Sequence, residues 1–375
     1  MEQVERRLCP CLSEAGPALG EVRDERTTHE LDRFGLLHEL GTRPPGPGSK
    51  RPTSEVRLGS IDASDHSIGS HGRASVLPLA PPDYPSAMTL TQRRYGAQSM
   101  TSTLRDVLVK RPGEAFGRAF DDPAHGFLSP VDLDVARREH DAFVEVLADL
   151  GPTIHVLDVE TDDPDLVYPF DPLLVTDRGA IPLRPGKPNR ADEPALLEAW
   201  TEAAGIPTLG RIDPPGTIEG GDTFWLRPDL FCLGRTLRTN ASGVAQLADL
   251  VGGDVRVFDV PYWKGPAELI HLMSVISPVA DDLAVVFLPL LPAGLWELLV
   301  DLDIRLIEVP EAEFPTLGCN VLAVRPGVVI IAEGNHVTSA ALTAAGCEVH
   351  TYPATQIGIN GSGGPTCMTR PILRD

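Results

Sequence analysis

The C-terminal stretch of the chain carries a cysteine in a setting that suits a nucleophile. Cys367 follows a glycine-rich run, Gly361 to Pro365, and precedes a strand-like run, Met368 to Leu373. Glycines allow positive φ angles and close approach of a ligand, so such a run can present one side chain at a pocket. The alternative is a loose tail that holds an inert thiol. The choice depends on whether the chain supplies the partners that a nucleophilic thiol needs.

A histidine and a pair of carboxylates are the first candidates for those partners. His271 opens an apolar stretch that ends at Ile276, a setting in which a histidine is more often a satisfied core residue than a catalyst. Glu219 and Asp222 enclose two glycines immediately before an expected strand, where glycine marks close approach by another group. A solvated turn is the alternative reading. Together these side chains could supply an acid/base and a holder for a cation.

Two further aspartates, Asp165 and Asp171, flank a short apolar segment. Aspartate usually caps a turn or lies at the surface, and that remains the alternative. If both lined one pocket with Glu219, the three carboxylates would repel one another unless the ligand carried a positive charge. The set therefore predicts a cationic ligand.

The composition excludes several other classes of function. The chain of 375 residues has 32 basic and 53 acidic side chains, a net charge of −21, so no nucleic-acid partner is expected. The six cysteines lack the spacing of a zinc site, so no metal is expected either. The longest apolar run, residues 283–300, is interrupted by Pro289 and Pro292, which argues against a membrane partner. With no signal-peptide pattern, a cytoplasmic location is predicted.

The chain divides into two regions of different character. Residues 1–90 are rich in Pro, Gly, Ser and charge and lack the periodicity of helices or strands. Such a segment cannot bury enough apolar surface to offset its ordering entropy, so a disordered extension is predicted. Two alternatives stay open: a partner-binding arm, and a true start at Met88 or Met100. The catalytic domain is expected to span residues 91–375.

From Thr101 onward the expected elements repeat one theme: two short strands, a helix and a third strand. The first complete unit is expected to end in a strand at Ile206 to Ile212, and the third to begin with one at about Leu272 to Ile276. Because each such sheet needs cover from its neighbours, the units should pack side by side. The four complete units are expected at residues 169–212, 223–260, 272–309 and 320–352.

A fifth unit is split between the ends of this region. Strand Leu104 to Val109, helix Asp132 to Leu150 and strand Ile154 to Val159 lack a partner strand, which Met368 to Leu373 could supply. Closing the first unit with the last strand predicts an α/β ring, a five-bladed propeller of β-β-α-β units; a sandwich with a mixed sheet is the alternative. In a ring, four units would bring together the candidate side chains Asp171, Glu219, His271 and Cys367.

The ordered motifs of this region resemble those of the dimethylarginine dimethylaminohydrolases. That family belongs to the guanidine-modifying pentein superfamily of arginine deiminases and amidinotransferases. The resemblance implies a five-bladed propeller and chemistry that needs no metal or organic cofactor, and it leaves residues 1–90 without a counterpart. The matching motifs are Phe170-Asp171, Arg184-Pro185-Gly186, Glu219-Gly220-Gly221-Asp222, Gly234 with Arg238-Thr239-Asn240, His271-Leu272 and the glycine-rich approach to Cys367.

Carried over residue by residue, the resemblance implies three catalytic side chains. Cys367 would be the nucleophile and His271 the general acid/base. Glu219 would orient the histidine or the substrate guanidinium. A thiolate would attack the guanidinium carbon, the histidine would protonate the departing amine, and water would then hydrolyse a covalent thiouronium adduct.

The same resemblance implies the residues that bind the substrate. Asp171 would hold the guanidinium, with Asp165 as a helper. Arg238 and Arg184 would bind the substrate carboxylate, a task that suits the two-pronged guanidinium group. Asp222 is expected among the substrate-binding residues as well.

Two positions bear on which guanidine is the substrate. Arginine deiminases usually carry His-x-Asp, whereas Met273 stands at that position, which favours an alkylated guanidine over arginine. Phe170 stands where the hydrolases commonly have an acid. The expected reaction is hydrolysis of dimethyl-L-arginine to citrulline and dimethylamine. An arginine deiminase, an amidinotransferase, a hydrolase of another substituted guanidine and a non-catalytic binding protein are the alternatives, and a homodimer is a candidate assembly.

Overall fold

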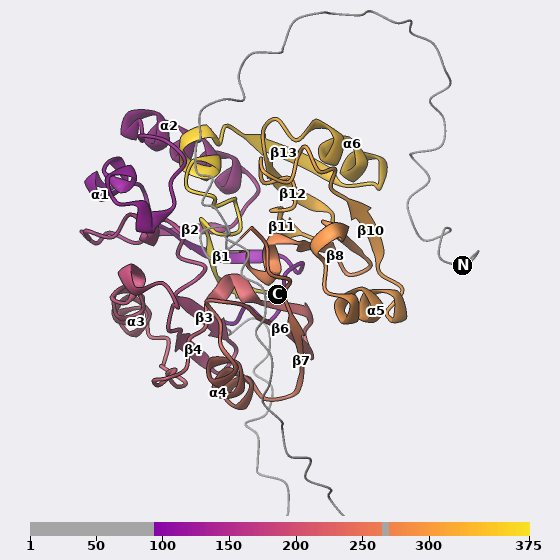
Figure 1. The fold of residues 1–375 in the computed structure, drawn as a ribbon, viewed down its shortest axis with the longest axis horizontal. Coiled ribbons are helices and arrows are strands. Elements are labelled where there is room, and N and C mark those ends of the chain that lie inside the picture. Colours follow the sequence, from indigo (N-terminus) through magenta and orange to yellow (C-terminus); the bar gives the residue numbers. More distant parts are fainter. Residues whose placement is uncertain (1–93, 265–269) are drawn as a thin grey trace, which may run out of the picture. The chain divides into compact units, whose positions relative to one another are not determined.

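The computed structural model describes residues 94–264 and 270–375, and this part of the chain folds into an α/β arrangement of five small sheets. Its helices lie towards the outside and its strands towards the middle (Figure 1). No helix among the described residues is both long and apolar enough to cross a membrane. The extension predicted for residues 1–90 lies outside the described residues.

One sheet joins the two ends of the described region. Strand β1 (Leu104–Val109) lies between β14 (Arg370–Arg374) and β2 (Thr153–Val156), antiparallel to the former and parallel to the latter. Val107 faces Pro371 on one side and Ile154 on the other. The prediction that the C-terminal strand completes the first unit is confirmed.

The other four sheets follow one another along the chain. In each three-stranded sheet the first two strands are antiparallel, and the third is parallel to the second after a helical crossover, as a parallel pair requires. The strands are β3 (Leu173–Thr176), β4 (Gly179–Pro182), β5 (Thr223–Arg227), β6 (Leu230–Arg235), β7 (Asp254–Asp259), β8 (Ile276–Ala280), β9 (Leu283–Val286), β10 (Arg305–Glu308), β11 (Leu322–Arg325), β12 (Val328–Ala332) and β13 (Glu348–Tyr352).

The helices begin and pack as their sequences dictate. Asp132 caps the longest helix, α2, by accepting a hydrogen bond from the Val135 amide at 3.0 Å, and Asn240 caps α4 by accepting one from the Gly243 amide at 2.9 Å. Both helices bury one apolar face against strands. The helices are α1 (Glu114–Gly117), α2 (Leu133–Asp149), α3 (Glu193–Ala203), α4 (Ala241–Val251), α5 (Ala293–Asp301) and α6 (His336–Ala344).

Two of the expected strands are wrong. The segment Ile206 to Ile212 forms no strand; a single bridge joins Thr208 to Ala180, so the sheet of β3 and β4 has two strands. Pro207 lacks an amide, which limits the pairing that this segment can make. The first strand of the third unit begins at Ile276, because Leu272–Ser274 form a 3-10 turn instead.

Candidate active site

Cys367 is held in a loop that packs closely against two side chains. A Cβ at Gly363 would overlap the ring of Tyr168, and one at Gly364 would overlap the Asn320 side chain. Asn320 donates from Nδ2 to the Cys367 Sγ over 3.2 Å, and its Oδ1 accepts from the Thr366 amide at 3.1 Å. The glycines are therefore required by close packing.

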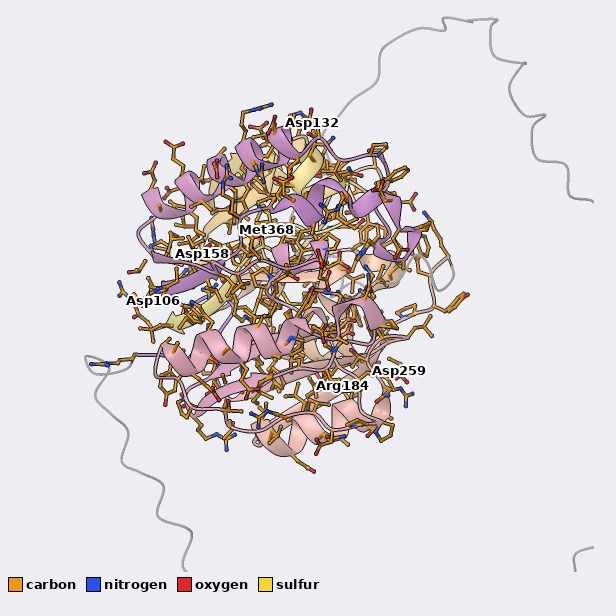
Figure 2. All side chains as sticks on the ribbon, turned by 90° about the vertical axis from the view of Figure 1, so that its left-hand side faces the viewer. Asp106, Asp132, Asp158, Arg184, Asp259 and Met368 are labelled. Carbon is orange, nitrogen blue, oxygen red and sulfur yellow. The ribbon has the colours of Figure 1, made fainter. Side chains whose placement is uncertain are left out.

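The backbone around the thiol is also fixed from behind. Met368, the next residue, lies fully buried among the interior side chains (Figure 2). The carbonyl of Cys367 accepts a hydrogen bond from the Phe170 amide at 3.3 Å, which joins the loop to the segment that carries Asp171. In the glycine-rich run the residue with positive φ is Ser362, at 59°.

The Cys367 thiol is half-buried, whereas the other described cysteines, Cys232, Cys319 and Cys347, are buried. Burial and the negative charge of Asp171 raise the pKa of the Cys367 thiol to about 11, although the hydrogen bond from Asn320 opposes them. The thiol is therefore protonated at neutral pH. A cation placed beside Asp171 would lower the pKa of the thiol.

Glu219 and His271 form a close pair behind the thiol loop. The Oε2 of Glu219 lies 2.6 Å from the Nε2 of His271, and Oε1 accepts from the Gly186 amide at 3.0 Å. Burial of Glu219 favours its neutral form, but the charges of Arg238 and His271 outweigh it and lower its pKa. Burial and Arg238 likewise oppose the charged form of His271, yet Asp171, Asp222 and Glu219 raise its pKa. Both shifts favour the charged forms, a carboxylate beside an imidazolium.

Gly221 makes room for this pair. A Cβ there would overlap the His271 ring and lie 3.0 Å from the Oδ1 of Asp171. Gly221→Ala is expected to lower the free energy of unfolding by about 1–3 kcal/mol, the usual cost of overpacking, and to shift the His271 ring resonances. Denaturation and NMR measure the two effects. Gly113→Ala is the control, because its Cβ would meet nothing within 4 Å. Equal stability of the two variants would contradict the packing argument.

Asp171 lies between the thiol loop and the Glu219–His271 pair. Its Oδ1 accepts from the Gly221 amide at 2.9 Å, and its Oδ2 lies 2.6 Å from Nη1 of Arg190. Burial raises the pKa of Asp171, but the charges of His271 and Arg190 outweigh that effect and lower it. Asp171 is therefore ionised at neutral pH.

Arg190 is a functional neighbour that the sequence reasoning missed. It is buried, and it pairs with Glu193 at 2.8 Å as well as with Asp171. Arg190 ends a 3-10 turn and Glu193 begins α3, and their spacing of three residues is the signal that could have indicated the pair. The contact of Arg190 with Asp171, which lies nineteen residues earlier, has no local signal in the sequence.

Asp165 is buried and already has a cation. Its Oδ2 lies 2.6 Å from the Lys187 ammonium and 3.3 Å from Nδ1 of His125. Burial opposes ionisation, but the hydrogen bond with His125 and the charges of Arg190 and Lys187 lower the pKa of Asp165 to about 2. Lys187 and His125 were not among the predicted site residues.

The two predicted arginines lie at the site in different ways. Arg238 extends into it, with Nε 3.0 Å from the Oε2 of Glu219 and Nη2 2.6 Å from the Nε2 of His271. Arg184 is exposed at the surface (Figure 2) and donates from Nη1 to the carbonyl of Gly216 at 2.9 Å. Gly186, two residues after Arg184, packs against the backbone of Arg238. The motif that contains Arg184 and the motif that contains Arg238 are therefore adjacent in the structure.

Asp222 holds the segment that carries His271. Its Oδ1 accepts from the Leu272 amide and its Oδ2 from the Thr236 hydroxyl, both at 2.8 Å. Burial raises the pKa of Asp222, although His271 and these hydrogen bonds oppose the shift. With both oxygens engaged, Asp222 positions the site from behind.

Phe170 and Met273 belong to one apolar cluster next to the site. Phe170 is buried, and the Arg370 guanidinium stacks on its ring at 3.9 Å from the centroid. Met273 is 5% exposed. The positions at which an acidic side chain was considered thus form an apolar wall.

Two groups of described side chains have ligand atoms close enough to hold a metal ion. In both groups a carboxylate already pairs with a basic side chain of the same chain: Lys187 in the first, and Arg190 and Arg238 in the second. These residues therefore suit a flat organic cation better than a metal ion. The groups are His125, Asp163 and Asp165, and Asp171, Glu219 and His271.

Comparison with known proteins gives related enzymes. The profile of the arginine deiminase family matches residues 293–374. The N(G),N(G)-dimethylarginine dimethylaminohydrolase of Streptomyces coelicolor is 31% identical over 187 residues, which cover 50% of this chain and 69% of the relative. That of Pseudomonas aeruginosa is 28% identical over 222 residues, covering 57% and 80%. An arginine deiminase of Listeria welshimeri is 27% identical over 258 residues, covering 56% and 62%.

Solved structures share the fold. The structure of a variant of the Pseudomonas aeruginosa dimethylarginine dimethylaminohydrolase, complexed with citrulline, has a TM-score of 0.61 at 24% identity and covers 73% of this chain and 100% of its own. The N-terminal domain of ArgZ, a cyanobacterial arginine dihydrolase, has a TM-score of 0.64 at 17% identity and covers 72% and 98%. The chain therefore belongs to the dimethylarginine dimethylaminohydrolase family, within the pentein superfamily that includes the arginine deiminases.

Proposed function

We propose that the protein is a cysteine hydrolase of a substituted guanidine, with dimethyl-L-arginine as its substrate. The observation that supports this most is the pair of buried Glu219 and partly buried His271, 2.6 Å apart, beside Asp171 and the loop of Cys367. Two ionised carboxylates, an imidazolium and a thiol are the groups that cleavage of a guanidinium C–N bond requires. The relatives named as dimethylarginine dimethylaminohydrolases support the choice of substrate.

We infer that the five sheets form a closed five-bladed propeller around this site. The pairing of β14 with β1 supports closure, because it joins the last strand of the described region to the first unit. The site residues come from several units: Asp171 precedes β3, Glu219 precedes β5, His271 precedes β8 and Cys367 precedes β14. A ring is the arrangement in which these equivalent positions meet.

The first half of the proposed reaction forms a covalent adduct. Asp171 and Glu219 hold the guanidinium cation, and its charge lowers the pKa of Cys367, so the thiol loses its proton to solvent. The thiolate attacks the guanidinium carbon to give a neutral tetrahedral adduct. The His271 imidazolium then protonates the dimethylamino nitrogen, and dimethylamine leaves. The product is a thiouronium cation on Cys367 beside a neutral histidine.

The second half releases the ureido product. Neutral His271 takes a proton from water as the oxygen attacks the thiouronium carbon. The tetrahedral adduct collapses by breaking the C–S bond, and Cys367 departs as thiolate. The remaining oxygen proton passes to the Cys367 thiolate, which restores the thiol and gives citrulline. His271 thus acts first as an acid and then as a base.

A substrate panel tests the proposal. We expect citrulline from dimethylarginine at a kcat/KM at least about tenfold above that for arginine, a modest difference typical of contacts to added methyl groups. An arginine deiminase is the second candidate, favoured by the family match over residues 293–374. Faster citrulline formation from arginine would decide for it. Transfer of the amidino group to added glycine or ornithine would indicate an amidinotransferase.

A further inference from the structure

The site contains a guanidinium group that belongs to the protein itself. The Arg238 side chain, 18% exposed, places Nε 3.0 Å from the Oε2 of Glu219 and Nη2 2.6 Å from the Nε2 of His271. Glu219 is fully buried and has His271 as its other cationic partner. Arg238 therefore lies against the carboxylate and imidazole that the proposed reaction needs for the substrate's own guanidinium.

With Glu219 ionised, neither protonation state of His271 satisfies this three-way contact. When His271 is an imidazolium, Nε2 donates to the Oε2 of Glu219, and the Arg238 Nη2 donor then faces another donor at 2.6 Å. When the Nε2 of His271 is unprotonated, it accepts from Arg238 but presents its lone pair to a carboxylate oxygen at 2.6 Å. One of the two contacts is unfavourable in either case, so departure of Arg238 relieves a conflict.

The backbone of Arg238 is anchored while its side chain can move. The Thr236 hydroxyl accepts from the amides of Arg238 at 3.2 Å and Thr239 at 3.0 Å, and donates to Asp222. Gly186 packs directly on the Arg238 backbone. The neighbouring Leu237 is 59% exposed, so the turn lies at the surface. Rotation of the Arg238 side chain about this fixed turn can therefore carry its guanidinium away from Glu219 and towards the surface.

We propose that Arg238 is a placeholder that exchanges with the substrate: the substrate guanidinium takes its position at Glu219 and His271, and Arg238 moves to the substrate carboxylate. The inference rests on the proposed function and adds a basis for specificity. A guanidine without a carboxylate must displace Arg238 from Glu219 and offers it no anion in return. A guanidino acid supplies both charges, so the exchange favours substrates that carry a carboxylate.

Binding of N,N-dimethylguanidine, which has no carboxylate, tests the exchange. Full-length Cys367→Ala protein is titrated by calorimetry, so that turnover does not interfere. Adding Arg238→Met is expected to tighten dimethylguanidine binding about tenfold. This factor corresponds to a site from which Arg238 has moved away in about one-tenth of the molecules. The same change is expected to weaken dimethylarginine binding. Arg256→Met is the matched control, because Arg256 is exposed and pairs with Asp254 at 2.7 Å on β7, outside the site. It should leave dimethylguanidine binding unchanged.

A second readout does not depend on ligand binding. The groups that face His271 are Arg238, Glu219, Asp171 and Asp222. Removing the one cation among them by Arg238→Met should raise the pKa of His271, followed by NMR of its ring, whereas Arg256→Met should not. Unchanged dimethylguanidine affinity together with an unchanged His271 titration would overturn the exchange alone. Failure of Cys367→Ala to bind dimethylarginine, with no citrulline from the wild type, would overturn the proposed function as well.

Discussion

Replacing Cys367 with alanine should abolish hydrolysis, with kcat lower by on the order of 10⁴-fold or more. The proposed reaction passes through a bond between the Cys367 sulfur and the guanidinium carbon, and the other described cysteines are buried away from the surface. The fold should persist, because Asn320 still binds the Thr366 amide and Met368 still fills the core. Citrulline formation and the thermal midpoint measure activity and folding separately.

Cys347→Ala is the control for this variant. Cys347 is buried next to β13, in a different apolar cluster from the one against which Cys367 packs. Its replacement should lower the thermal midpoint modestly and leave kcat within about threefold, since it contacts no site residue. A Cys367→Ala protein that retained substantial turnover would exclude covalent catalysis through this thiol.

His271→Asn should lower kcat by about 10²–10⁴-fold, the usual contribution of a general acid/base. Asparagine keeps a hydrogen bond within reach of Glu219 but cannot carry the proton to dimethylamine. The pKa of His271 in the folded protein is raised, so the imidazolium persists to higher pH than in a free histidine. In the wild type, activity should fall as pH rises through that raised pKa; the variant should lack this basic limb.

His155→Asn provides the matched control for His271→Asn. His155 also contacts a carboxylate, Asp106, at 2.8 Å, but lies on β2 away from the site. Its replacement should leave kcat and the pH profile unchanged. Loss of the basic limb in both variants would remove the case for His271.

The raised pKa of His271 also predicts an effect on stability. The contribution of His271 to the free energy of unfolding is fully present below about pH 6.5 and is lost as the pH rises through the folded-state pKa.

Much of the fold could be predicted because it rests on local periodicity and short turns. The expected strand Leu104 to Val109 and helix Asp132 to Leu150 agree with β1 and α2 to within a residue. The closing role of β14 followed from counting elements, since the first unit lacked a strand. The expected strand at Leu272 was wrong because the apolar side chains there are buried in a 3-10 turn, which periodicity alone does not distinguish from a strand.

The site was predictable in its residue types but only partly in its geometry. Glu219, His271, Asp171 and the Cys367 loop lie together as expected. The neutralising cations were missed, because the Arg190–Asp171 contact joins residues whose separation in sequence carries no signal. Nor could the sequence indicate that the Arg238 guanidinium lies against Glu219 and His271.

The most direct test of covalent guanidine hydrolysis is mass spectrometry of the protein quenched during turnover of dimethylarginine. The account predicts an adduct on the peptide that contains Cys367, with the mass of the substrate less dimethylamine. Steady citrulline formation by the wild type with no adduct on Cys367, under quench conditions that preserve a thiouronium standard, would contradict the account.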